Sequence, residues 1–210
     1  MPESRKRTQS CEDYAFLQVL MKKGFMSVDS ARDLLERLHG DANRLEQLLS
    51  ALNERVREHS FGVQKMLSML DKQEYIAFIN KDGDDAGCKM ASHFSQPQRE
   101  FFKAVLEGIA LSGESPELGG LISSTDALNI QTLSTLSQAP LSQNTSFKSK
   151  LTKRDMEATL EQLVAEGWLA SCSEYTGYYS IGVRSFMELK RYLMSLPLPE
   201  ATKEEWSKVL

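Results

Sequence analysis

Residues 150–196 read KLTKRDMEATLEQLVAEGWLASCSEYTGYYSIGVRSFMELKRYLMSL, and this stretch decides the fold. Its first apolar side chains share one face at helical spacing: Met156, Leu160, Leu163 and Val164. They predict an amphipathic helix that ends at Gly167. Residues 168–170 and 178–181 are rich in aromatic and branched side chains, so they predict two strands joined by a polar loop. A helix over residues 183–196 follows, and this order is typical of the end of a winged-helix domain.

The N-terminal part of the chain predicts the same order of elements. Three helices are expected over residues 12–23, 27–40 and 41–56, because apolar side chains recur at helical spacing and capping residues or glycines separate the segments. Residues 61–68 and 75–80 then predict a hairpin. In the first helix, the side chains expected to face inward are Tyr14, Leu17, Leu20 and Met21.

The second half begins after a polar break that contains glycines, at residues 81–87. A helix over residues 96–112, a short strand at 121–122 and a brief helix capped by Ser124 are expected before the opening stretch. Residues 131–149 are rich in Ser, Thr, Gln and Asn. We interpret them as a flexible loop, and a functional loop is the alternative.

The predicted fold class is therefore mainly α with small β-hairpins (α+β), in two tandem winged-helix domains. The two halves repeat one order of elements without obvious residue identity. The predicted limits are residues 1–11 for a flexible N-terminal tail, 12–85 for the first winged helix, 86–196 for the second with its flexible loop at 131–149, and 197–210 for a linker towards a further C-terminal domain.

The bulk composition is that of an ordinary globular protein. The 210 residues are 41% hydrophobic and 26% charged. Their formal net charge of −4 argues weakly against broad nucleic-acid binding, but it does not exclude a local basic patch. No apolar run approaches the roughly 20 residues of a membrane span, so no membrane contact is expected. Three widely separated cysteines fit a reducing compartment, either cytosol or nucleus.

The sequence predicts no catalytic, cofactor-binding or metal site. The three histidines, His39, His59 and His93, lie beside no serine or cysteine in a nucleophile motif. Surface or helix-capping roles are the simpler interpretation of these histidines. Cysteine and histidine pairs at zinc spacing are absent, as is a phosphate-binding glycine loop.

Four basic residues form the electrostatic feature most relevant to function: Lys148, Lys150, Lys153 and Arg154. They lie before and at the start of the helix in the recognition position of a winged helix, so they are candidate contacts for DNA phosphates. A solvated basic turn is the alternative. Glu157 and Glu161 follow on the same helix and would repel DNA, so any contact is expected with phosphates rather than bases.

Several short segments resemble one known family. Residues 75–80 (YIAFIN) and 89–91 (KMA) with Phe94 resemble the end of the first winged helix and the junction in the non-SMC element 1 subunit family of the Smc five–six complex. The second winged helix of that family is similar to three further segments: residues 123–125 (SST), 128–129 (LN) and 168–169 (WL). The resemblance extends over about residues 12–196.

This resemblance implies a nuclear, chromosome-associated subunit that acts in DNA repair, DNA recombination and chromosome maintenance. It implies tight pairing with a MAGE-type winged-helix subunit, with a kleisin subunit nearby. It also implies a C-terminal, zinc-binding RING-like domain that gives E3 ubiquitin ligase activity together with the MAGE-type partner. No RING ligands occur up to Leu210, so zinc and the ligase chemistry are expected only in such a further domain.

Three functional hypotheses follow from these observations. The first is an interaction scaffold that docks a MAGE-type partner, which the acidic balance and the apolar helix faces support. The second is a module that binds double-stranded DNA through phosphate contacts. The third is the non-catalytic part of a ubiquitin ligase, which rests on the resemblance alone and leaves open whether the chain takes part in an enzyme.

Overall fold

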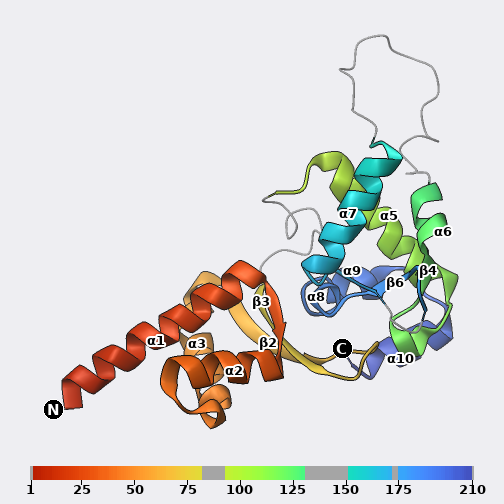
Figure 1. Ribbon diagram of the computed structural model, residues 1–210. Helices are drawn as coiled ribbons and strands as arrows, with labels where there is room; N and C mark the ends of the chain where they lie inside the picture. Colours follow the sequence, from red (N-terminus) through yellow and green to blue (C-terminus); the bar gives the residue numbers. More distant parts are fainter. Residues whose placement is uncertain (1, 82–92, 131–150, 172–174, 210) are drawn as a thin grey trace. The chain divides into compact units, whose positions relative to one another are not determined.

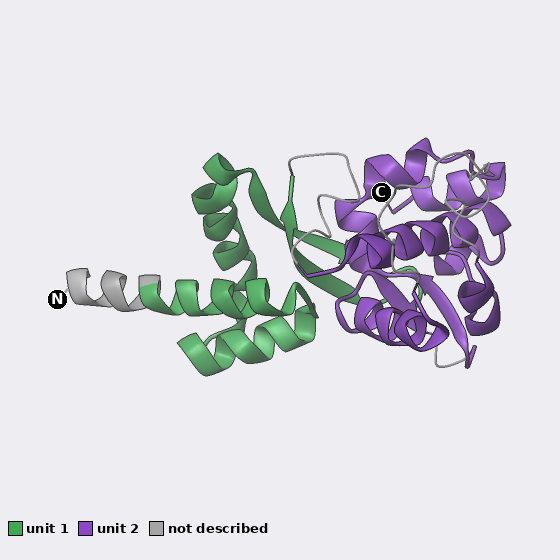
Figure 2. Cartoon of the chain, turned by 90° about the horizontal axis from the view of Figure 1, so that it is seen from above, with its two compact units in different colours: residues 1–83 green, residues 84–210 purple. Residues whose placement is uncertain are grey.

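The computed structural model describes residues 2–81, 93–130, 151–171 and 175–209 (Figure 1). The chain forms two compact units, Met1–Gly83 and Asp84–Leu210, which are coloured separately in Figure 2. The domain limit predicted after residue 85 lies close to this division. The predicted flexible loop at 131–149 lies outside the described residues.

The first unit has the element order of a winged helix. Its elements in chain order are α1 (Pro2–Lys23), β1 (Phe25–Ser27), α2 (Val28–His39), α3 (Leu45–Val56), β2 (Phe61–Leu67) and β3 (Glu74–Asn80). The strands form an antiparallel sheet in the order β1-β3-β2. The hairpin pairs from Phe61 with Asn80 to Leu67 with Glu74, which confirms the predicted wing. The strand β1 was not predicted, because three residues are too few to show an alternating pattern.

The inward face of α1 differs from the prediction. Tyr14 and Met21 are 52% and 54% exposed, whereas Phe16 and Leu20 are fully buried. Asp13 is also buried, on the same face as Phe16 and Leu20. A prediction based on apolar side chains alone does not select this face, because the face contains the carboxylate of Asp13. In the structure that carboxylate is paired with Arg55 of α3, so its burial is tolerated.

Helix α1 begins at Pro2, so it includes most of the segment for which a flexible N-terminal tail, residues 1–11, was predicted. Proline is favourable in the first turn of a helix, where its missing N–H is not needed. No glycine or second proline follows until Gly24, whose left-handed backbone (φ 79°) ends the helix. The Gly24 N–H donates to the carbonyl of Leu20 at 2.8 Å.

The outer edge of β2 is covered by a side chain from α3. The Asn53 Nδ2 donates to the Val63 carbonyl at 2.9 Å, and the Asn53 Oδ1 accepts from the Val63 N–H at 2.7 Å. These two Val63 groups point away from β3, so one carboxamide pairs both a donor and an acceptor of the sheet edge.

The second unit repeats the order of the first and then extends it. Its elements are α5 (Gln96–Ser112), β4 (Ile122–Ser123), α6 (Ser124–Asn129), α7 (Lys153–Ala165), β5 (Leu169–Ser171), β6 (Tyr178–Ile181), α8 (Val183–Glu188), α9 (Lys190–Ser195) and α10 (Glu200–Ser207). The sheet order β4-β6-β5 matches that of the first unit. The predicted α+β class with two winged helices is thus confirmed. The N-cap of α6 is Ser123 rather than Ser124, since the Ser123 hydroxyl accepts from the Asp126 N–H.

The single helix predicted over residues 183–196 is two helices, α8 and α9. Leu189 stands between them with φ −109° and ψ 16°. Its N–H still donates to Ser185 and its carbonyl still accepts from Leu193 N, so hydrogen bonding continues across the break. Phe186, Leu189 and Leu193 are buried, as their spacing predicts.

The linker predicted for residues 197–210 contains a packed helix instead. Trp206 of α10 is fully buried, and its ring and that of Phe186 lie edge to face with centroids 5.2 Å apart. The helix also packs on the short 3-10 turn Pro116–Leu118. Among the described residues, no helix is long and apolar enough to cross a membrane.

Candidate interface on the second winged helix

The start of α7, the helix in the recognition position, is fixed by a capping box. The Thr152 Oγ1 accepts from the Asp155 N–H at 3.2 Å, and the Asp155 carboxylate accepts from the Thr152 N–H at 3.0 Å. The Thr152 hydroxyl also donates to that carboxylate at 2.7 Å. This hydroxyl bond is the main cause that lowers the pKa of Asp155. The first turn of α7 therefore carries a carboxylate that stays ionised.

Two of the four predicted phosphate contacts lie in this first turn. Lys153 and Arg154 are both exposed there. Lys148 and Lys150 lie outside the described residues. Because Asp155 is adjacent to Lys153 and Arg154, its negative charge offsets part of their positive charge. The basic character of this end is thus local, and DNA contact through these residues stays a prediction.

The exposed side of α7 becomes acidic further along. Glu157 and Glu161 are both exposed. The pKa of Tyr179 in β6 is raised by burial, and further by the carboxylates of Glu161 and Glu157. These exposed carboxylates disfavour direct contact of this side of α7 with DNA bases, and contact with phosphates alone stays a prediction.

The wing carries an exposed pair of tyrosines. Tyr175 and Tyr178 are 44% and 38% exposed, and their rings meet edge to face with centroids 6.5 Å apart. Gly177 between them has φ 84°, a left-handed conformation that favours glycine in a tight turn. The Gly177 carbonyl accepts from the Ser124 N–H at 2.7 Å, which attaches the turn to α6. Exposed aromatic pairs of this kind are common in protein interfaces.

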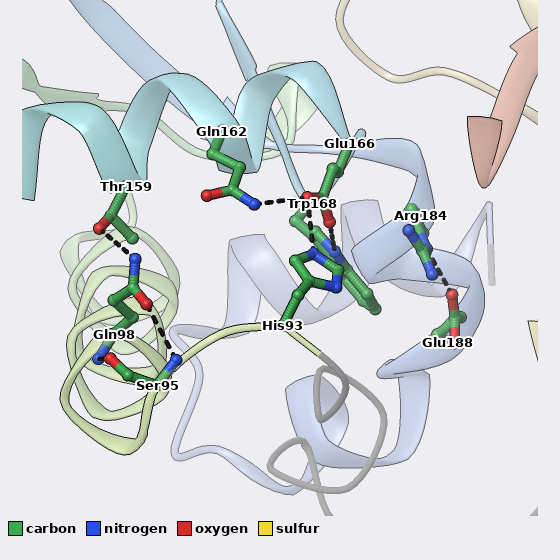
Figure 3. Close-up of polar contacts among 9 residues, drawn as sticks. All are labelled: His93, Ser95, Gln98, Thr159, Gln162, Glu166, Trp168, Arg184 and Glu188. Atoms are coloured by element: carbon green, nitrogen blue, oxygen red, sulfur yellow. Dashed lines mark hydrogen bonds and ion pairs between the residues drawn. The ribbon is translucent and has the colours of Figure 1, made fainter. Parts of the chain in front are cut away.

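The C-terminal end of α7 is held by a polar cluster around Glu166 (Figure 3). The Glu166 carboxylate accepts from Gln162 Nε2 at 3.0 Å and from Trp168 Nε1 at 3.3 Å. His93 Nε2 lies 2.7 Å from the same carboxylate. His93 lies three residues before Gln96, the first residue of α5, so this contact joins the segment that leads into α5 to the end of α7. The surface role expected for His93 therefore left out its contact with Glu166.

The N-terminal half of α7 is joined to α5 by a second polar contact (Figure 3). The Gln98 Nε2 donates to Thr159 Oγ1 at 3.1 Å, and the Thr159 hydroxyl donates to the Asp155 carbonyl at 2.6 Å. The Gln98 Oε1 also accepts from the Ser95 N–H at 2.9 Å, as part of the capping box of α5. One glutamine thus positions α7 and caps α5.

An ion pair within α8, between Arg184 and the buried carboxylate of Glu188, lies against the ring of Trp168. The Arg184 guanidinium lies 4.2 Å from the centroid of the Trp168 ring, and its Nε donates to Glu188 Oε1 at 2.6 Å. The Glu188 side chain is only 3% exposed. Sequence reasoning missed the two contacts that join α7 to the start of α5 because their residues lie far apart in the chain: 73 positions for His93 and Glu166, and 61 for Gln98 and Thr159.

Within the described ranges, no group of three or more His, Cys, Asp or Glu side chains could hold a metal ion. What the surface offers is a rigid α7, a charged first turn and an aromatic wing.

The family described as "Nse1 non-SMC component of SMC5-6 complex" matches residues 13–189. The chain belongs to this family. The resemblance seen in short segments such as residues 75–80 is thereby confirmed, and the match extends over both winged helices. The matched residues end before α10.

A solved structure agrees with the family assignment. The chain is similar to a chain of an "Nse1-Nse3-Nse4 complex", with 27% sequence identity and a TM-score of 0.66. The similarity covers 88% of this chain and 73% of that chain. The comparison with curated proteins gave no match.

Proposed function

We propose that the chain is a scaffold subunit of the Smc five–six complex that assembles with a MAGE-type winged-helix subunit and a kleisin subunit. The observation that carries this proposal is the similarity to a chain solved with Nse3 and Nse4, which covers 88% of the present chain. Nse3 is the MAGE-type subunit and Nse4 the kleisin. Membership of the Nse1 family supports a nuclear, chromosome-associated role in DNA repair.

Pairing with the MAGE-type subunit is the direct test of the scaffold function. We expect a one-to-one complex in size-exclusion chromatography and calorimetry. Replacing both wing tyrosines, Tyr175→Ser and Tyr178→Ser, is expected to weaken it by about tenfold or more, as for aromatic hot spots. The matched control is Tyr14→Ser, a comparably exposed tyrosine of the first unit. Failure of the unmodified chain to form a stoichiometric pair would contradict the scaffold function. An unchanged affinity of the double variant would show that the two wing tyrosines are not part of the binding surface, and would leave the scaffold function itself intact.

Binding of double-stranded DNA is the second candidate function, favoured by the exposure of Lys153 and Arg154 in the first turn of α7. Charge reversal of both residues to Glu is expected to weaken duplex binding and to reduce the slope of log affinity against log salt by about 2. The control reverses Lys22 and Lys23, an adjacent exposed pair in the last turn of α1. Equal losses in the two double variants would indicate a net-charge effect, and the assignment of phosphate contacts to α7 would then be wrong.

Ubiquitin ligation enters the proposal only for an assembly that includes a RING-like zinc domain, as the family resemblance implies. In such an assembly, the two winged helices would position the RING-like domain and the MAGE-type subunit. The residues of the second unit that hold α7 and the wing rigid, among them Gln98, Glu166 and Arg184, are the ones that would maintain that geometry.

A further inference from the structure

Helix α10 is attached to the second unit through one narrow face. Its two buried side chains, Thr202 and Trp206, are about one helical turn apart and lie on the same side of the helix. Trp206 packs edge to face on Phe186 of α8, and the helix rests on the 3-10 turn Pro116–Leu118. We call this turn together with Phe186 the α10 seat. The other residues of 200–208 are exposed or half-buried, so Thr202 and Trp206 form the main attachment.

Hydrogen bonding along this face is incomplete. Among the described residues, neither Thr202 Oγ1 nor Trp206 Nε1 has a hydrogen-bond partner, although both atoms are buried. Each atom therefore gives up its bonds to water when α10 docks, and receives none in return. In the part of the chain that the structure describes, α10 also has no side-chain cap after Pro199, whereas serine or threonine side chains cap α5, α6 and α7. Docked α10 is thus held less firmly than those three helices.

The turn in the α10 seat has a conformation that needs support from its surroundings. Ser115, which precedes the turn, has φ 46°, a left-handed conformation that serine seldom adopts. The Ser115 carbonyl accepts from the Leu118 N–H at 3.0 Å and from the Gly120 N–H at 3.1 Å, which closes the turn. Because a strained backbone persists only where packing maintains it, the turn depends on the helix that covers it.

The α10 seat is joined directly to β6, the central strand of the second sheet. Ser180 of β6 is fully buried, and its Oγ donates to the Leu118 carbonyl at 2.6 Å. The backbone of Gly119 lies close to both parts of this junction, since a Cβ atom on it would be 2.9 Å from Ser180 Oγ and 3.2 Å from Phe186 Cε2. A movement of the turn therefore alters the contacts of β6, which forms the wing together with β5.

We propose that α10 is a releasable brace for the second wing. Docked α10 covers the turn Pro116–Leu118, so it keeps water from the bond between Ser180 and Leu118 and holds β6 in place. When α10 detaches as a unit, the turn is exposed, water competes for the Leu118 carbonyl, and β6 opens more readily. The proposal concerns the mobility of the wing, and it does not depend on which partner the wing contacts.

Amide hydrogen exchange in the full chain tests the release of α10. Thr202→Val removes a buried hydroxyl without a partner and keeps the branched shape of the side chain. We expect the amides of α10 to exchange about tenfold more slowly in this variant, although most substitutions of buried residues destabilise a protein. Unchanged or faster exchange would overturn the proposal, because the hydroxyl would then be bonded in the docked state, for example to a buried water.

A control in the same helix separates docking from helix formation. The Ser207 hydroxyl donates to the Lys203 carbonyl within α10, and Ser207 is exposed. Ser207→Ala should therefore leave the exchange of the α10 amides nearly unchanged. A slowing equal to that of Thr202→Val would attribute the effect to the helix itself and would overturn the proposal.

The connection to the wing is tested by the amides of β6 in the same measurement. Thr202→Val is expected to slow their exchange by about threefold, while the amides of α5 and α7 stay unchanged. Ser180→Ala removes the bond to Leu118. In the Ser180→Ala background, Thr202→Val should still slow α10 but should no longer affect β6.

Three results would overturn the role of α10 as a brace. The first is no response of β6 to Thr202→Val. The second is a response of β6 that survives Ser180→Ala, since the bond between Ser180 and Leu118 would then not carry it. The third is equal slowing in α5, α7 and β6, which would indicate a general gain in stability of the unit.

Discussion

Replacing Trp206 with alanine is expected to lower the free energy of unfolding of the second unit by about 3–5 kcal/mol, the usual loss for a fully buried large aromatic side chain. The side chain is fully buried and meets Phe186 edge to face. Urea unfolding followed by fluorescence measures this loss, since Trp168, the other of the two tryptophans, lies in the same unit.

Two control variants separate packing from the other properties of the indole. The Trp206 Nε1 is buried without a hydrogen-bond partner. Trp206→Phe keeps an aromatic ring and removes that polar atom, so it should cost clearly less than alanine. Tyr175→Ala, at an exposed aromatic, should change stability by no more than about 0.5 kcal/mol. A loss below about 1 kcal/mol for Trp206→Ala would mean that α10 is not docked on the unit in solution.

Replacing Arg184 with methionine is expected to lower the free energy of unfolding of the second unit by about 3–5 kcal/mol, because it removes the cation paired with the buried carboxylate of Glu188. Methionine keeps an unbranched apolar stem over Trp168 but leaves the Glu188 carboxylate, 3% exposed, without the guanidinium at 2.6 Å. Urea unfolding with Trp168 fluorescence as the signal measures the loss.

A second substitution, at Glu188, distinguishes the loss of the ion pair from a loss of packing. Arg184→Met combined with Glu188→Leu should recover most of the lost stability, since a buried ion pair replaced by apolar side chains is often neutral or stabilising. Lys208→Met, which breaks an exposed pair with Glu205, should cause no measurable change. If the double variant is no more stable than Arg184→Met, the loss does not come from the Glu188 charge.

Local patterns were sufficient to predict the wings. The hairpin of β2 and β3 joins two neighbouring runs of strand-forming residues, and the strands β5 and β6 are bounded by Gly167 and a polar loop. Each of these signals lies within about 20 residues, so no knowledge of the remaining chain is needed. The helix ends at Gly24 and Gly40 were predictable for the same reason.

Long-range contacts explain what the sequence did not reveal. The buried face of α1 contains Asp13, which becomes favourable only when Arg55 and His39 approach from α3 and α2. In α10 the single large apolar side chain is Trp206, and the Phe186 ring on which it packs belongs to another helix, α8. At the candidate interface, the exposure of Lys153 and Arg154 could be expected from a run of basic residues, and their contact with DNA stays a prediction. The polar contacts that fix α7 could not be predicted, because His93 and Glu166 are 73 positions apart.

The carboxamide of Asn53 has a consequence for how copies of this protein behave towards one another. An unprotected strand edge can accept a strand from another molecule, which leads to aggregation. Asn53 already bonds the outward N–H and carbonyl of Val63 in the middle of β2, so an incoming strand meets an occupied position. The wing of the first unit can therefore present its side chains to a partner while its backbone resists self-association.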